Sequence, residues 1–106
     1  MNVEDMKKNA AQAAGLLKQL ANENRLWILC QLLEGELSVG ELNERVDLSQ
    51  SALSQHLAKL RQEGLVSTRK QGLNVYYSLG NPAVAKVLET LHSIYCSTQP
   101  ITDLQV

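Results

Sequence analysis

Apolar residues recur with helical spacing along the first third of the chain. From about Asp5 to Leu20 they stand at every third or fourth position, which predicts an amphipathic helix. The following segment, RLWILCQLL, is apolar nearly all round, which is typical of a buried central helix. We expect Asn22 to cap this second helix and Gly35 to end it.

Two shorter helices are predicted next. Ser38 and Glu41 form an S-x-x-E capping box that opens one helix, and Ser49 caps another that runs to about Glu63 and stops at Gly64. The positions expected to face inward are all aliphatic: Val39, Leu42, Val46, Leu48, Leu53, Leu57 and Leu60. Two helices joined by a short turn around such a set predict a helix-turn-helix.

After Gly64 the period of the pattern changes from 3.6 to 2, which indicates strands. VSTRK and LNVYYSL read as a hairpin with Gln71 and Gly72 at its tip. One face of the second strand is expected to carry Leu73, Val75, Tyr77 and Leu79, and the other Asn74, Tyr76 and Ser78. Pro82 then opens a last helix with an apolar stripe: Val84, Val87, Leu88, Leu91, Ile94 and Tyr95.

The elements follow the order α-α-α-α-β-β-α, a mainly α fold with a small β-hairpin. This order predicts a winged helix-turn-helix in one domain over residues 1–106, with a frayed tail at about 98–106. The chain is 44% hydrophobic and 20% charged, as expected of a globular protein. No stretch approaches the roughly 20 apolar residues that span a bilayer, and the first residues lack the apolar core of a signal peptide. We therefore expect a cytoplasmic location and no membrane partner.

The solvent face of the helix after Ser49 carries short polar side chains instead of the Glu, Lys and Arg usual on solvated helices. The candidate DNA-binding residues on it are Gln50, Ser51, Ser54, Gln55, His56 and Lys59. Glutamine can pair with adenine, serine can contact a base or a phosphate, and Lys59 suits a phosphate. His56 taken alone is more typical of a structural or surface histidine than of a base reader.

Charge is unevenly distributed along the chain. The net charge is −1, but the segment from Leu48 to Gly80 holds four basic residues against Glu63 alone, a net charge of +3. Arg69 and Lys70 fall in the predicted hairpin, where a wing could reach the DNA backbone or an adjacent minor groove. Together with the helix-turn-helix, this favours double-stranded DNA as partner over the alternative, a winged-helix protein-interaction module.

An enzyme is not expected. The sequence has no Gly-rich phosphate loop, no plausible Ser-His-Asp or Cys-His triad and no paired carboxylates in a predicted cleft. We therefore predict no catalytic residue and no cofactor.

Three segments together resemble a known family. LANENRLWILCQLLEGELSVGEL, LSQSALSQHLAKLRQEGLV and YYSL are similar to the ArsR/SmtB family of bacterial winged-helix repressors, from about Met6 to Cys96. The S-x-x-S-x-H-L pattern from Ser51 to Leu57 is the most specific part. The resemblance implies a homodimer built on the first and last helices. It also implies a DNA operator with dyad symmetry, whose half-sites lie roughly 34–36 Å apart or a multiple of this.

Metal-sensing members of that family differ from this chain. Their thiolate motif would fall on ELSVGEL, where Ser38 and Gly40 occupy the places of the cysteines. The last helix offers only Glu89, His92 and Cys96 as ligands, without a second histidine. We therefore expect no metal.

Cys30 and Cys96 resemble the cysteine pair of the thiol-based, reactive-sulfur-responsive branch of the family, which includes regulators of haemolysin expression. EGELSVGEL and IYC also resemble that branch. The resemblance implies that oxidation or polysulfide bridging of the two cysteines weakens operator binding. A bridge would pin the last helix against the second and so alter the spacing of the recognition helices.

A different role for the cysteines remains open at this point. Cys30 is also compatible with a small buried hydrophobe, and Cys96 with an accessible thiol of no consequence. The chain would then be a DNA-binding regulator without a thiol switch, which relieves silencing by constitutive promoter occupancy.

Overall fold

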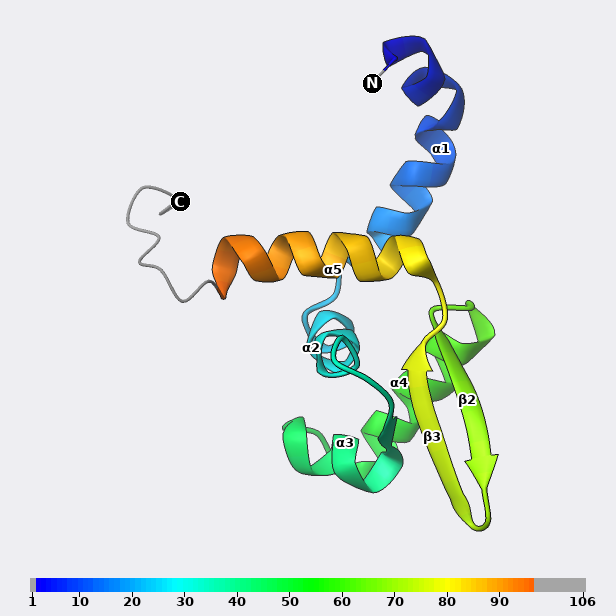
Figure 1. Cartoon of the computed structure of the whole chain (residues 1–106), viewed down its shortest axis with the longest axis vertical. Helices are drawn as coiled ribbons and strands as arrows, with labels where there is room; N and C mark the ends of the chain where they lie inside the picture. Colours follow the sequence, from blue (N-terminus) through cyan, green and yellow to red (C-terminus); the bar gives the residue numbers. More distant parts are fainter. Residues whose placement is uncertain (1, 97–106) are drawn as a thin grey trace.

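The computed structural model describes residues 2–96, which form five helices and a small sheet whose β2–β3 hairpin extends at one side of the molecule (Figure 1). The elements are α1 (Val3–Leu20), α2 (Glu23–Gln31), β1 (Leu37–Ser38), α3 (Val39–Arg45), α4 (Gln50–Gln62), β2 (Val66–Gln71), β3 (Asn74–Leu79) and α5 (Pro82–Tyr95). The predicted fold class, mainly α with a β-hairpin, is confirmed. The predicted frayed tail lies outside the described residues.

Side-chain caps begin the helices at the residues expected. The Asn22 side chain accepts the Arg25 N–H at 3.0 Å, and the Ser49 hydroxyl accepts the Ala52 N–H at 3.1 Å. Ser38 and Glu41 form a reciprocal capping box, with donor–acceptor distances of 2.9 and 3.1 Å. Each cap satisfies backbone donors that have no partner inside the helix, so these starts follow from local sequence.

The sheet has one strand more than predicted. Its order is β1-β3-β2 with antiparallel pairing throughout, and the two residues of β1 lie opposite Tyr77 and Tyr76 of β3. A strand of two residues is too short to show alternation in the sequence. The hairpin turn also differs: it consists of Gly72, with φ of 63°, and Leu73, which is fully exposed at the tip and does not lie on a strand face.

The core lies where α2, α3, α4 and α5 meet the sheet. Of the aliphatic set expected to face inward, Leu42, Val46, Leu53, Leu57 and Leu60 are buried, while Val39 and Leu48 pack partly buried against them. The prediction for the second helix was wrong in two respects. It ends at Gln31, before Gly35, and one side of it is open, because the Trp27 side chain is 53% exposed.

An ion pair joins α2 to the end of α4 inside the fold. The Arg25 guanidinium donates to Glu63 at 2.7 Å and to the Gln19 carbonyl at 2.9 Å, with side-chain exposures of 10% for Arg25 and 25% for Glu63. Removing one partner of such a pair leaves the other charge without compensation. We therefore assign Arg25 and Glu63 to stability.

α1 projects from the body of the molecule, and only its last turns approach the other helices (Figure 1). Leu20 is its one buried residue, while Val3, Met6 and Leu17 are exposed. The apolar stripe predicted for this helix is therefore largely without a partner within residues 2–96.

Candidate nucleic-acid interface

α3 and α4 bury their inner sides and leave the outer side of α4 open. Because Leu53 and Leu57 fall on one side of α4, the residues between them in sequence point away from the core. Six of the predicted DNA-binding residues lie on this helix: Gln50, Ser51, Ser54, Gln55, His56 and Lys59. All are exposed except His56, which is half-buried. The structure thus groups them on one element.

The polar groups of this α4 face have no competing internal partners in residues 2–96. None of the six side chains forms a hydrogen bond or an ion pair within that part of the chain. Glutamine amides and serine hydroxyls supply both hydrogen-bond donors and acceptors. Base edges in a major groove also carry donors and acceptors, so the two can form hydrogen bonds with each other. The arrangement therefore suits direct contact with DNA bases.

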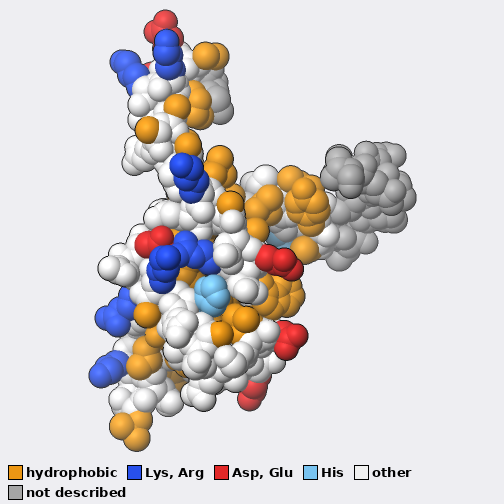
Figure 2. Space-filling model, turned by 180° about the vertical axis from the view of Figure 1, so that it is seen from behind, with side chains coloured by type: hydrophobic (Ala, Val, Ile, Leu, Met, Phe, Trp, Pro, Cys, Tyr) orange, Lys and Arg blue, Asp and Glu red, His pale blue; other side chains and the backbone are white. Residues whose placement is uncertain are grey.

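Basic side chains collect on the wing side of this face. Figure 2, which views the molecule from behind Figure 1, shows Lys and Arg along the edge formed by the wing, and most Asp and Glu toward the opposite edge. The exposed basic residues of the α4–β2 segment are Lys59, Arg61, Arg69 and Lys70. The basic residues of this segment thus lie together along one edge of the surface, and their positive charge would attract the phosphates of the DNA backbone.

The two wing cations are in different environments. Lys70 lies exposed near the end of β2, opposite Val75. Arg69 lies one residue further from the tip, opposite Tyr76, and its guanidinium forms an ion pair with Glu36. The side-chain hydrogen bonds that Arg69 donates to Glu36 lower the pKa of Glu36 below the ordinary range of a glutamate. The same bonds raise the pKa of Arg69.

Glu36 was not a candidate from the sequence. It lies 33 residues before Arg69, in the segment between α2 and β1. Only the pairing of β1 with β3 brings that segment beside the wing, so no local pattern could reveal the contact.

The two cysteines lie on adjoining helices and are both free thiols. Cys30 is half-buried on α2, and Cys96 is exposed at the end of α5, where its N–H donates to the His92 carbonyl at 2.8 Å. Burial raises the pKa of the Cys30 thiol above its ordinary value, and electrostatic interaction with Cys96 adds to the increase. The structure therefore brings the thiols, 66 positions apart in sequence, within electrostatic reach of each other.

A cavity of about 380 Å³ opens beside Cys30. It is lined by Cys30, Gln31, Leu33, Glu34, Arg45, Glu89 and His92. Among residues 2–96 no group of three or more His, Cys, Asp or Glu side chains is placed to hold a metal ion. None of the described helices is long and apolar enough to cross a membrane.

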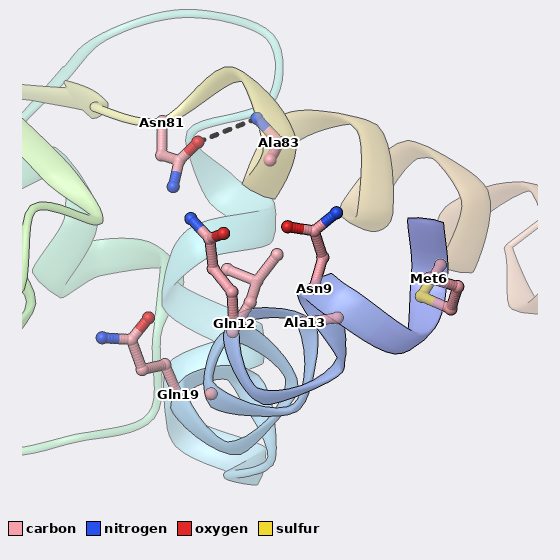
Figure 3. Close-up of a pocket in the computed structure, with 9 residues that line it drawn as sticks. Met6, Asn9, Gln12, Ala13, Gln19, Asn81 and Ala83 are labelled. Carbon is pink, nitrogen blue, oxygen red and sulfur yellow. Dashed lines mark hydrogen bonds between the residues drawn. The ribbon is translucent and has the colours of Figure 1, made fainter. Parts of the chain in front are cut away.

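A second hollow lies between α1 and the first turn of α5 (Figure 3). The Asn9 and Gln12 amides point from α1 toward this turn, where the Asn81 side chain accepts the Ala83 N–H at 2.9 Å. Met6 lines the same hollow further along α1. None of its lining residues is on α4 or in the wing strands, so we do not assign it to the polar and basic face.

Comparison with known proteins agrees with this geometry. Residues 22–68, which include α2, the helix-turn-helix and the start of β2, match the family described as "Bacterial regulatory protein, arsR family". The transcriptional activator HlyU of Vibrio cholerae is 58% identical over 96 residues, which are 91% of this chain and 89% of that protein. The biofilm growth-associated repressor of Xylella fastidiosa is 40% identical over 99 residues, 93% of this chain and 87% of that protein.

The likeness extends to a crystal structure. The transcriptional regulator HlyU from Vibrio vulnificus superposes with a TM-score of 0.84 at 57% identity, covering 91% of this chain and 100% of that chain. These relatives are named as a transcriptional activator, a repressor and a transcriptional regulator, which agrees with the expectation that the chain is not an enzyme.

Proposed function

Since the chain belongs to the arsR family and is a DNA-binding transcriptional regulator, we propose that it binds its operator as a homodimer and that a thiol switch lowers its affinity. The observation that carries the operator contact in this proposal is the open polar face of α4 beside a basic wing. In the proposal, Gln50, Ser51, Ser54, Gln55 and His56 meet base edges. The phosphate contacts come from Lys59, Lys70 and Arg69.

Unpartnered apolar surface supports the homodimer. Val3, Met6 and Leu17 on α1 are exposed, and Tyr95 at the end of α5 is 65% exposed. Large apolar side chains gathered on an element with few internal contacts are typical of a protein–protein interface. A second copy seated on α1 and α5 would cover them and present two α4 helices to a DNA site with dyad symmetry.

Salt dependence separates DNA binding from a protein-docking role. The operator is first selected from a random duplex library by the purified protein, and binding is then followed by fluorescence anisotropy over a salt series. We expect log affinity to fall steeply with log salt, because Lys and Arg release counterions from phosphates. The slope of log affinity against log salt should become shallower in the variants Lys59→Met and Lys70→Met. The change should be about one for each phosphate that the replaced lysine neutralises in the wild-type complex.

Lys86→Met is the matched control for this series, since Lys86 is exposed and belongs to α5, not to α4 or the wing. It should leave the slope close to that of the wild type. A failure to enrich any duplex, with no salt-dependent DNA binding, would instead favour a protein-interaction module.

The placement of the cysteines supports the switch. α2 and α5 are in contact, and both contribute residues to the common core: Ile28 and Leu29 from α2, Val84 and Leu88 from α5. Cys30 also interacts electrostatically with Cys96. A bridge between the thiols would join the core helix α2 to a helix of the proposed dimer interface. Changing how these helices meet would change the separation of the two α4 helices and hence the fit to both half-sites.

An inorganic polysulfide or a peroxide can act as the oxidant. With a polysulfide, the Cys96 thiolate attacks a sulfur atom and displaces a shorter polysulfide, which leaves a persulfide on Cys96. The Cys30 thiolate then attacks the Cys96 sulfur and expels hydrosulfide, which closes a disulfide. With a peroxide, the two thiols together lose two protons and two electrons; hydrogen peroxide is reduced to two water molecules, and an organic hydroperoxide to an alcohol and water.

Cys96 should be alkylated before Cys30 in the native, reduced protein. Cys96 is exposed, whereas Cys30 is half-buried with a raised pKa, so little of it is thiolate at neutral pH. The Cys30 rate should therefore keep rising with pH beyond about 8.5, the ordinary pKa of a thiol. Peptide mapping by mass spectrometry after timed iodoacetamide treatment measures both rates, and the protein unfolded in urea should show similar rates for both. Faster native alkylation of Cys30 would contradict the proposed order of attack.

A further inference from the structure

Every nitrogen of the Arg69 guanidinium is occupied within the protein. Nε donates to Oε2 of Glu36 at 3.2 Å, Nη2 donates to Oε1 of the same carboxylate, and Nη1 donates to the Gln71 side chain at 2.8 Å. The guanidinium carbon also lies 4.8 Å from the centre of the Tyr76 ring. Arg69 is thus held by a two-pronged carboxylate contact on one side and an aromatic face on another.

The stability of the folded protein is a poor explanation for this ion pair. The Arg69 and Glu36 side chains are 49% and 39% exposed, and an ion pair between such exposed groups contributes little to folding. The backbone pairing of β1, β3 and β2 already holds the two segments together. The Arg25–Glu63 pair, with exposures of 10% and 25%, shows what a buried structural pair looks like in this fold.

A guanidinium binds a carboxylate and a phosphate with the same parallel pair of N–H groups. Arg69 is on β2, a wing strand that contacts α4, where the phosphate backbone would run in the proposed complex. We propose that Glu36 is an internal substitute for a DNA phosphate, which occupies Arg69 in the free protein and is displaced by a backbone phosphate when the wing meets DNA. This inference rests on the proposed contact between the wing and DNA.

Glu36 consequently weakens DNA binding in this proposal. Arg69 must exchange one anion for another, and the released carboxylate remains close to the phosphates that repel it. Without that carboxylate, Arg69 and Lys70 would both be free to neutralise the backbone. Glu36 would therefore restrain the sequence-independent part of affinity, which comes from phosphate contacts.

Glu36→Gln tests this in the full-length, reduced protein with the selected operator and with a duplex of unrelated sequence. Glu34→Gln is the matched control, because Glu34 is in the same segment and its substitution removes the same charge. We expect Glu36→Gln to raise affinity for both duplexes roughly two- to fivefold per protomer beyond the control. The slope of log affinity against log salt should also steepen by about one per protomer. In an Arg69→Met background the advantage over Glu34→Gln should shrink to the part that comes from repulsion between the carboxylate and the phosphates.

Several outcomes would overturn the inference. Equal affinities of Glu36→Gln and Glu34→Gln would show that Glu36 does not restrain Arg69. Weaker binding by Glu36→Gln would show that the pair supports the wing. An Arg69→Met protein with wild-type affinity and salt slope would show that Arg69 meets no phosphate. In each case the wild type still binds DNA, whereas failure of the proposed function would appear as no salt-dependent binding by the wild type.

Discussion

Operator affinity is expected to fall about 30-fold or more when Ser54 and Gln55 are both replaced by alanine. One good bidentate contact to a base contributes about 1–3 kcal/mol. A homodimer would lose such a contact in each half-site, so the combined loss is about 2–6 kcal/mol, and the lower limit already corresponds to about 30-fold. Both residues are exposed and alanine is a better helix former, so the fold should be retained.

Anisotropy titrations at one fixed salt concentration measure this loss, and circular dichroism checks the helix content. Gln62→Ala is the control, because Gln62 is exposed in the last turn of the same helix. The double variant should also tolerate more base changes in the operator, whereas removal of a phosphate contact would weaken binding to all sequences alike. If the double variant binds no more weakly than Gln62→Ala, α4 is not the element that reads the bases.

The second large effect that we expect is a loss of operator affinity when the wild-type protein is oxidised. A coupling of about 1–3 kcal/mol between the thiols and the DNA site corresponds to a 5- to 150-fold loss of affinity after polysulfide or diamide treatment. Intact mass on the same samples should show a species lighter by two hydrogen atoms, or heavier by added sulfur, in which Cys30 is linked to Cys96. A reductant should restore both the mass and the affinity.

The single variants Cys30→Ser and Cys96→Ser identify the cause of the loss. Neither can form the bridge, so both should keep their affinity under the same treatment. If either loses affinity as fully as the wild type, the bridge is not the switch. Independent reaction of the two thiols with unchanged affinity would favour a regulator controlled by its abundance, which relieves silencing by constitutive occupancy of the promoter.

The relatives include both an activator and a repressor by name. A change in operator affinity serves either role. Release of DNA ends repression where the protein blocks transcription, and it ends activation where the protein displaces a silencing factor. The proposed thiol switch would therefore act on operator affinity, and its effect on transcription would depend on the promoter.

Local features of the fold could be predicted from the sequence because their physical causes are local. Asn22, Ser38 and Ser49 cap helices through bonds to residues three positions ahead, and Gly72 supplies the positive φ of the hairpin turn. The polar face of α4 follows in the same way, since helical periodicity alone separates it from the buried leucines. The sequence by itself thus determined the helix-turn-helix, the wing and the candidate base-reading residues.

Only the tertiary structure decided which distant groups meet. The two-residue strand β1 exists because β3 is beside it, and that pairing brings Glu36 to Arg69 across 33 residues. The packing of α2 against α5 likewise brings Cys30 and Cys96 within electrostatic reach and raises the pKa of Cys30. Such contacts depend on how whole elements are oriented against a common core, and no periodicity or spacing in the chain encodes a single pair of side chains at that separation.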